Sequence, residues 1–311
     1  MRRRESAALV VNAGAKEAAD ALAAARDALR SAGLEIAYAV RVEEPDGLEP
    51  ALQGALRSGS RHVVVGGGDG TLGTAAGILA PAGALLSVLP LGTANDFARA
   101  LRIPGELAAA AAVAAGGAER EVDLGRAGRR HFLNAASFGL SSALTRRLSG
   151  GLKRAAGPLA YPVAAAAEAP VHDPFHLVLE ADGERHELAA LQVVVGNGRY
   201  HGGGRVVAPS ARLDDRRLDV YAILAASHDR GDVEADRLKD LWTLARFAML
   251  LRRGRHLEHP RVLALRTARL SARTDPPLEI DADGELAGTT PVELSIAERR
   301  LRVTVPPPRG G

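Results

Sequence analysis

A strand pattern in this 311-residue chain runs directly into a glycine-rich turn around one aspartate. Three valines at residues 63–65 are followed by the letters GGGDGT at residues 66–71. Glycine lets the backbone approach a ligand closely, and the helix expected after the turn aims its N–H groups at the same point, which favours phosphate. Asp69 can order this loop or act near phosphate through a metal ion or a sugar hydroxyl. We expect Asp69→Ala to abolish activity and to leave thermal stability close to that of the native chain.

A second strand pattern, at residues 84–89, ends in a similar turn. Its continuation reads LPLGTANDFAR, in which Thr93, Asn95 and Asp96 can cap a new helix. Capping alone explains each of these residues taken singly. Two such turns at one sheet edge instead indicate a ligand cleft, because open α/β sheets bind their ligands at that edge.

Two better-known nucleotide-binding patterns fit this sequence poorly. The glycines Gly68, Gly70 and Gly73 match GxGxxG, but they follow a later strand than the first, and the next strand ends without the acidic residue that a dehydrogenase needs. The P-loop pattern is absent from the sequence, and so is cysteine. P-loop NTPases, thiolate metal sites and cysteine nucleophiles are therefore excluded.

The tetrapeptide ADGE occurs twice, at residues 181–184 and 282–285. The first copy lies between two strand patterns and is typical of a hairpin turn that leaves Glu184 in solvent. The flanks of the second copy are less easily explained as a plain hairpin. Acidic residues crowd there, including Asp283 and Glu285, and crowding of negative charge raises a carboxyl pKa and suits a proton acceptor.

The two halves of the chain differ in the order of their strand and helix patterns. Up to about residue 124, short apolar runs alternate with helical patterns, which predicts a parallel, doubly wound sheet. Strand patterns dominate afterwards, one of them at residues 131–138, and predict a β-sandwich. We therefore predict an α/β nucleotide-binding domain at residues 1–126. An all-β sandwich domain is predicted at residues 127–311, with its last strand or tail able to return to the first domain.

Two helical patterns interrupt the second half, at residues 158–167 and 233–252. The end of the longer one, residues 238–253, is amphipathic and carries arginines such as Arg252 and Arg253. Packing against the fold is the ordinary explanation of such a helix. Contact with a membrane surface is the alternative.

Taken as a pair, GGDGT at residues 67–71 and PLGTANDFA at residues 90–98 resemble the catalytic family of diacylglycerol kinases, in its branch of soluble bacterial lipid kinases. The segments FLNAASFG, VGNGRYHGGG, ARLDDRRLDV and IDADGE extend this resemblance over nearly the whole chain. The resemblance implies an N-terminal nucleotide domain, a C-terminal β-sandwich, and ATP bound in the cleft between them.

The same resemblance assigns roles to single residues. It makes Glu285 the general base, with Asp283 beside it, and it places Asp69 in the catalytic centre. Binding of ATP is assigned to Asn12, Gly67, Gly68, Asp69, Gly70, Thr71, Leu72, Gly73, Thr74, Thr93 and Asn95.

A magnesium site is also implied by the resemblance. Asp215 would ligate Mg²⁺ together with the main-chain carbonyls of Arg212 and Arg217, and oxygen atoms are the ligands that Mg²⁺ prefers. Arg216 stands in this turn where the family usually has glycine. A solvated surface hairpin is the alternative for the turn.

We expect an ATP- and Mg²⁺-dependent lipid kinase, most simply one acting on diacylglycerol, with phosphatidylglycerol or a sphingoid base as other acceptors. Phosphoryl transfer needs neutralised charge, in-line positioning and a carboxylate that takes the hydroxyl proton. An NAD kinase is the alternative enzyme, although its family would not supply ANDFA or the late DGE turn. A catalytically silent nucleotide- or lipid-binding protein is the third possibility.

Composition limits the partners of this chain. The net charge of +3 and the aromatic content of 3% are too small for a nucleic-acid binding surface. No apolar run approaches the ~18–20 residues that cross a bilayer. We therefore expect a cytoplasmic enzyme that visits the inner face of the membrane as a peripheral protein, with its lipid substrate as partner.

Overall fold

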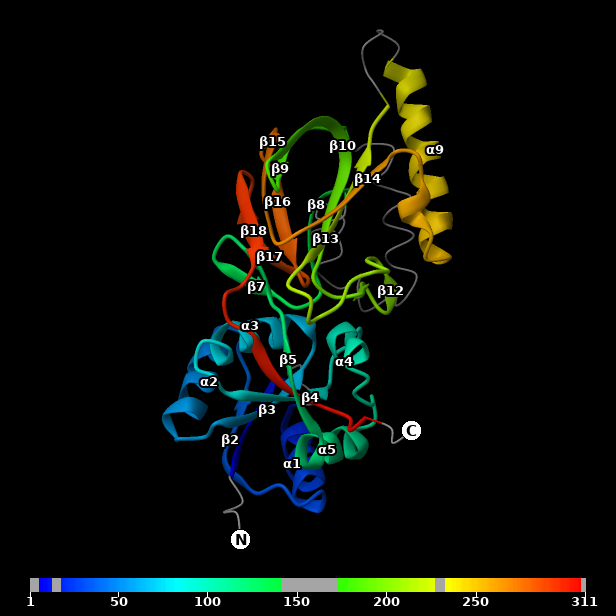
Figure 1. Cartoon of the computed structure of the whole chain (residues 1–311). Coiled ribbons are helices and arrows are strands. Elements are labelled where there is room, and N and C mark those ends of the chain that lie inside the picture. The colour runs from blue at the N-terminus through cyan, green and yellow to red at the C-terminus, as the bar shows by residue number, and fades with distance from the viewer. Residues whose placement is uncertain (1–5, 13–17, 141–172, 227–232, 309–311) are drawn as a thin grey trace.

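An α/β body and a larger β body lie end to end (Figure 1). The computed structural model describes residues 6–12, 18–140, 173–226 and 233–308, and the helix predicted at residues 158–167 lies outside these ranges.

The N-terminal sheet has six strands in the order β2-β1-β3-β4-β19-β5. The first five of these run parallel to one another, and β5 closes the edge in the antiparallel direction. The last strand of the chain, β19, therefore lies inside the first sheet. The strands span β1 Ala7–Asn12, β2 Ile36–Val42, β3 His62–Gly67, β4 Leu85–Pro90, β5 Ala118–Val122 and β19 Leu301–Val305.

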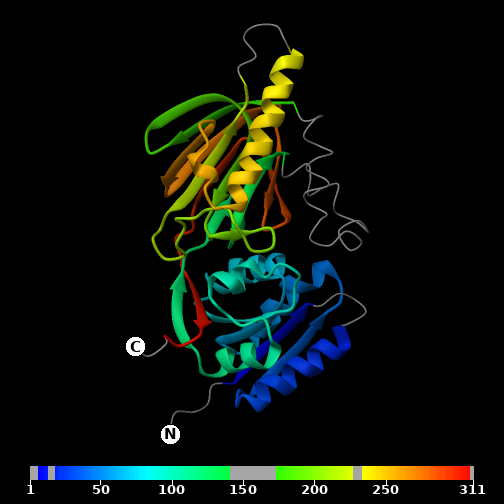
Figure 2. The same ribbon diagram turned by 90° about the vertical axis from the view of Figure 1, so that its right-hand side faces the viewer.

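Helices cover both faces of this sheet (Figure 2). One face carries α1 (Ala18–Ser31) and α5 (Leu107–Gly116), and the other carries α2 (Leu48–Arg57) and α3 (Asp69–Leu79). The strands between them are apolar on both sides and almost fully buried, as expected for a parallel sheet. The turn η1 (Pro45–Gly47) precedes α2, and the short helix α4 (Asp96–Ala100) follows β4.

The second body is a β-sandwich, as predicted. Its strands follow the order β17-β16-β8-β10-β9-β15-β18-β6-β7, and β13 joins β10 to β14. The long strand β10 (Glu184–Gly196) pairs with β9 along its first half and with β8 and β13 along its second, so it connects the two layers. The remaining strands are β6 Gly125–Ala127, β7 Arg130–Phe132, β8 Ala135–Gly139, β9 Phe175–Ala181, β13 Leu218–Leu224, β14 Val262–Thr267, β15 Arg269–Asp275, β16 Glu279–Ala282, β17 Glu285–Thr289 and β18 Val292–Ile296.

Three smaller elements complete the sandwich. The hairpin of β11 (Tyr200–His201) and β12 (Arg205–Val206) faces α4 of the first body. The helix α9 (Val233–Arg252) lies outside the sheet of β10, β13 and β14 and leads into η3 (His256–Glu258). In the described part of the chain, no helix combines the length and the apolar character needed to cross a membrane.

One predicted strand is wrong. Residues 131–138 do not form a continuous strand but divide into β7 and β8, with Leu133 and Asn134 between them. The main-chain N–H groups of these two residues donate to the carboxylate of Asp283 instead of to a neighbouring strand. A contact with a residue some 150 positions away therefore interrupts an otherwise regular strand pattern.

Candidate active site

The two glycine turns pack directly against each other at the ends of β3 and β4. A Cβ atom on Gly92 would lie 2.4 Å from the Cα atom of Gly68, so only glycine fits there. The N–H group of Leu91 donates to the carbonyl of Gly67 at 3.1 Å. The turns therefore form one cradle, and the first N–H groups of α3, which have no partner within the helix, open into it.

Asp69 ties this cradle together. Its carboxylate accepts hydrogen bonds from the N–H groups of Asp96 (3.1 Å) and Phe97 (2.9 Å) at the start of α4. It also accepts one from the side-chain amide of Asn134 at 3.0 Å. The side chain therefore caps a helix and joins it to the second body, which argues against the expectation that Asp69→Ala leaves thermal stability close to that of the native chain.

The other predicted nucleotide residues divide into cradle residues and core residues. Asn12 donates from its side-chain amide to the Thr71 hydroxyl at 2.9 Å, which fixes β1 to the start of α3. The side chain of Asn95 holds the second turn by accepting from the N–H group of Gly92 at 3.0 Å and donating to its carbonyl at 2.7 Å.

Thr93 lies exposed at the tip of the second turn, and Thr74 is half-buried on α3. Leu72 is fully buried in the core of the first body, so its side chain cannot contact a nucleotide. The carboxylate of Asp283 fills the space beside Gly73, where it would lie 3.4 Å from an added Cβ atom. Of Leu72, Gly73 and Thr74 on α3, only Thr74 therefore has a side chain that a nucleotide could contact.

Asp283 comes from the second body and is held by three main-chain donors. One carboxylate oxygen accepts from the N–H group of Leu133 at 2.6 Å, and the other accepts from those of Asn134 (2.9 Å) and Ala135 (3.1 Å). Burial raises the pKa of Asp283 to about 6, and the negative charge of Asp69 acts in the same direction, whereas the N–H groups of Leu133 and Ala135 oppose it. Asp283 is thus a fixed group at the junction of the two bodies.

Glu285 lies over the first turn of α3. One of its carboxylate oxygens would be 3.1 Å from a Cβ atom on Gly70, so the absence of a side chain on Gly70 makes room for this acid. Among the described residues, no hydrogen bond or ion pair is recorded for the Glu285 side chain, which is exposed. The structure thus brings Asp69, Asp283 and Glu285 to one junction, with Glu285 as the unconstrained carboxylate.

The expectation that the second ADGE copy departs from a plain hairpin is wrong for the turn itself, although the β16–β17 pairing beyond the turn is irregular between Glu279 and Asp281, unlike the pairing around the first copy. Asp283 and Gly284 have φ angles of 53° and 89°, and Asp182 and Gly183 have φ angles of 51° and 85°. Each pair is a two-residue turn with positive φ at both central positions, which are the angles of a type I′ hairpin. The alanine that begins each tetrapeptide pairs across the turn with the glutamate that ends it.

Two residues outside the predicted set also belong to the junction. The carboxylate of Asp96, 2% exposed, accepts from the N–H groups of Gly203 and Gly204 and so fixes the β11–β12 hairpin to α4. Asn134 is also buried, and its side-chain oxygen has no hydrogen-bond partner among the residues that the structure describes. In the sequence, Asp96 is explained as a helix cap, and Asn134 stands out only as a polar residue between apolar ones.

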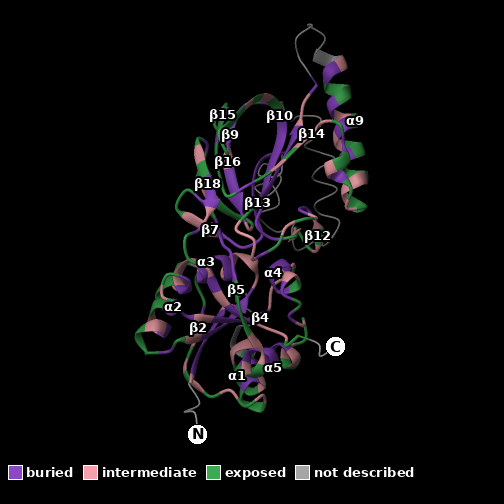
Figure 3. Cartoon of the chain, in the orientation of Figure 1, coloured by how far each residue is buried: buried purple, intermediate pink, exposed green. Residues whose placement is uncertain are grey.

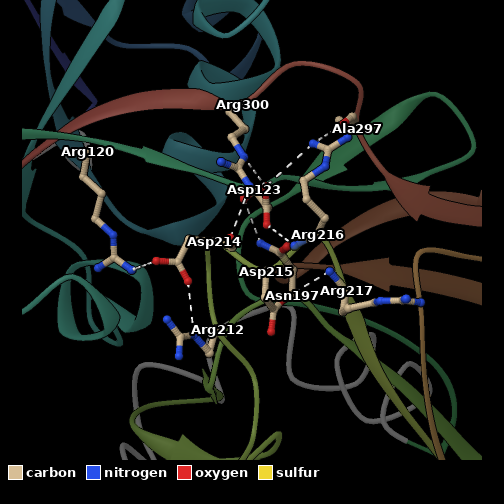
Figure 4. Close-up of polar contacts among 10 residues, drawn as sticks. All are labelled: Arg120, Asp123, Asn197, Arg212, Asp214, Asp215, Arg216, Arg217, Ala297 and Arg300. Carbon is tan, nitrogen blue, oxygen red and sulfur yellow. Dashed lines mark hydrogen bonds and ion pairs between the residues drawn. The ribbon is translucent and has the colours of Figure 1, made fainter.

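The turn before β13 lies where the chain crosses between the two bodies (Figure 4). Asp123, fully buried between β5 and β6, accepts from the guanidinium of Arg300 at 2.9 Å and from the main-chain N–H group of Arg216 at 2.6 Å. Arg300 also donates to the carbonyl of Asp214 at 3.1 Å. The amide of Asn197 donates to the carbonyl of Asp123 at 3.1 Å. The chain passes from one body to the other between β5 and β6 and again between β18 and β19, and both connections contact this turn.

Asp215, the only side-chain ligand of the predicted magnesium site, is engaged by other groups in this arrangement. One carboxylate oxygen of Asp215 accepts from the guanidinium of Arg266 at 2.6 Å, and the other accepts from the N–H group of Arg217 at 3.1 Å. The side chain of Arg216 donates to the carbonyl of Ala297 at 2.8 Å, so a guanidinium also occupies the space beside the turn. No cluster of three metal-binding side chains occurs among residues 6–12, 18–140, 173–226 and 233–308. We therefore assign no step to a metal ion held by this turn.

A two-domain kinase is the class of protein that this fold and junction define. Residues 6–127 match the model of the diacylglycerol kinase catalytic domain, and residues 134–305 match that of the YegS C-terminal NAD kinase beta sandwich-like domain. The chain therefore belongs to the diacylglycerol kinase catalytic-domain family, in its lipid kinase branch, and the resemblance stated from the sequence is confirmed.

Individual relatives agree with this family. A Pseudomonas aeruginosa protein named "Probable lipid kinase YegS-like" is 36% identical over 306 residues, which cover 96% of this chain and 94% of the relative. A protein of Staphylococcus haemolyticus named "Diacylglycerol kinase" is 28% identical and covers 89% and 81% of the two chains. A crystal structure of a diacylglycerol kinase from Bacillus anthracis has the same fold, with a TM-score of 0.69, 22% identity and 98% of each chain covered.

Proposed function

We propose that this kinase transfers the γ-phosphoryl group of ATP to the hydroxyl group of a lipid, with diacylglycerol as the favoured acceptor. The observation that carries the proposal is the position of Glu285, a carboxylate of the second body that lies over Gly70 at the start of α3. A proton acceptor and a phosphate-binding helix start thereby face the same space. The names of the related kinases support a lipid as the acceptor.

The nucleotide side of the reaction rests on the two packed glycine turns. Main-chain N–H groups at the start of α3 and in the turn of Gly92 are donors for the phosphate oxygens. Asp69 and Asn95 hold both turns in place, so the backbone does not have to rearrange when the phosphates bind. Magnesium bound with the nucleotide would supply the remaining neutralisation of charge. Asn12 and Thr71 complete the cradle on the side of β1.

The proton side of the reaction divides between two acids. Glu285 accepts the proton of the acceptor hydroxyl as the new oxygen–phosphorus bond forms and the bond to the bridging oxygen of ADP breaks. Asp283 is the positioning residue, because its carboxylate is engaged by three N–H groups and fixes the turn that carries Glu285. This division of roles fits the general rule that a catalytic base needs a free lone pair within reach of the substrate.

The test is a transfer assay with γ-labelled ATP, Mg²⁺ and the purified full chain. Diacylglycerol, phosphatidylglycerol, a sphingoid base and NAD are offered separately, the lipids in mixed micelles. We expect label in the diacylglycerol product and none in NAD.

Label in NAD alone would overturn the proposal in favour of an NAD kinase. Binding of ATP without transfer to any acceptor would overturn it in favour of a silent binding protein. Label in another lipid but not in diacylglycerol would leave the lipid kinase assignment in place and correct the acceptor.

A further inference from the structure

The helix α9 buries several polar side chains and exposes several large apolar ones. Its inward face carries Asp236, Asp240 and Thr243, each no more than 6% exposed. The carboxylate of Asp240 accepts from the N–H group of Ala226 at 2.6 Å, and the carboxylate of Asp236 pairs with Lys239 at 2.8 Å. Packing on the sandwich explains Phe247, Leu244 and Leu251, which lie in or against the apolar cluster beneath the second half of the helix, but it does not explain the apolar residues of the opposite face.

The outward face of α9 holds large apolar side chains of its own. Leu238 is 59% exposed, Trp242 75% and Met249 51%. Their spacing of four and seven residues places them on one stripe of a helix, together with Ala245. Exposed apolar stripes of this kind are typical of surfaces that bind a partner or a membrane. In Figure 3 the buried residues of α9 lie on one face of the helix and the exposed residues on the other.

Positive charge lies at the end of the same stripe. Arg252 and Arg253 continue it at helical spacing and, with Ala245, Ala248 and Met249, line a depression of the surface. Both arginines are exposed, and no carboxylate of the described residues forms an ion pair with either. An apolar stripe that ends in unpaired arginines is complementary to a lipid surface with anionic headgroups, whereas a protein partner would need carboxylates at matching positions.

We infer that α9 docks this protein on an anionic lipid bilayer, with Leu238, Trp242 and Met249 inserted at the acyl boundary and Arg252 and Arg253 against the headgroups. The inference rests on the proposed function for the reason to visit a membrane, since a diacylglycerol acceptor resides there. It adds the surface that makes the contact and the lipid charge that the surface requires.

The position of α9 suits such a role. Its C-terminal end contacts β12, and the β11–β12 hairpin is held on α4 by Asp96. The arginine end of the stripe therefore lies toward the junction, and the opposite end points away from the first body (Figure 1). A bilayer in contact with α9 would thus lie beside the second body. The lipid headgroups that contact the arginines would then be close to the β11–β12 hairpin at the junction.

Trp242 makes the inference directly measurable, because it is the single tryptophan of the chain. We expect its fluorescence emission to shift to shorter wavelength when phosphatidylglycerol–phosphatidylcholine vesicles are added without ATP, and brominated acyl chains to quench it. Vesicles of phosphatidylcholine alone should bind far more weakly. High salt should weaken binding to the anionic vesicles, because the Debye length falls from ~10 Å at 0.1 M to ~3 Å at 1 M.

Two pairs of arginine substitutions separate this helix from general positive charge. Arg252→Ala with Arg253→Ala should lower the vesicle association constant by roughly 30-fold at low salt, since each basic residue near an anionic surface contributes about fivefold. Arg26→Ala with Arg30→Ala removes the same charge from exposed sites on α1 and should change it far less. Leu238→Glu with Met249→Glu should abolish the fluorescence shift while thermal unfolding stays native-like.

Three results would overturn the inference. They are an unshifted Trp242 emission with anionic vesicles, an equal effect of the two arginine pairs, and an emission that shifts with protein concentration alone, which would show that a second copy covers the stripe.

Phosphorylation of a short-chain, water-dispersed diacylglycerol is measured in parallel. Transfer without vesicle binding would reject the docking surface and keep the proposed function, and vesicle binding without transfer would do the reverse.

Discussion

Glu285 and Glu184 occupy the same position of the same tetrapeptide and both begin a strand after a two-residue turn. Only Glu285 lies against the start of α3, whereas the Glu184 side chain is 79% exposed beside His186. We predict that Glu285→Gln lowers turnover by ~10²–10⁴, the usual effect of losing a general base, with nucleotide affinity preserved. Steady-state transfer rates and ATP binding measure this. Glu184→Gln is the matched control, and equal losses in both variants would contradict the assignment.

Asp69 contributes to stability as well as to the packing of the two glycine turns. It accepts hydrogen bonds from two N–H groups of α4 and from Asn134. Asp69→Ala should therefore lower the free energy of unfolding by about 1–3 kcal/mol, in addition to its effect on activity. Urea denaturation measures the loss. Asp27→Ala, at an exposed position of α1, is the control, and a native unfolding free energy in Asp69→Ala would refute the capping role.

Asp283 should make stability depend on pH in the weakly acidic range. Burial raises its pKa from 3.8 to about 6. Between these values the folded protein holds a proton that the unfolded chain releases, so the free energy of unfolding falls as the pH rises through this window. Asp283→Asn should flatten this slope, as measured by denaturant titrations at several pH values. A slope as steep as in the native chain would show that other groups cause it.

At the scale of elements, the turn before β13 is held by guanidinium groups where a metal ion was predicted. Millimolar Mg²⁺ without nucleotide should leave the melting temperature of the native chain unchanged, because Arg266 already pairs with Asp215. Arg266→Ala leaves the carboxylates of Asp215 and Asp219 without this partner, and Mg²⁺ should then stabilise the protein. Stabilisation of the native chain that Asp215→Asn removes would restore the predicted metal site.

At the scale of the whole molecule, one buried carboxylate joins the two crossings between the bodies. Asp123→Asn removes the charge that pairs with Arg300 and Arg216. We expect a loss of about 2–3 kcal/mol in the free energy of unfolding. This is below the ~3–5 kcal/mol of a fully buried pair, because both guanidinium groups are partly exposed. Urea denaturation measures the change, and Glu119→Gln, which removes the partner of Arg302 on the surface, should cost less than ~1 kcal/mol. Equal losses in the two variants would contradict the joining role.

Features that depend on short stretches of chain could be predicted from the sequence. Periodicity predicted the parallel strands and α9, and the glycine turns predicted a phosphate cradle, because close approach of a backbone requires glycine wherever the turn is placed. The pairing of the two turns at one edge followed from the parallel order of β3 and β4.

Which groups lie next to one another depends on the packing of the two bodies and could not be predicted from the sequence. The two ADGE copies have the same turn geometry, so the turns themselves do not distinguish Glu285 from Glu184, whereas packing against Gly70 does. The break between β7 and β8, the capping role of Asp69 and the arginine partners of Asp215 likewise come from residues far apart in the chain. Such contacts depend on how the two bodies are packed, and a periodic pattern carries no information about which distant donor will reach a given carboxylate.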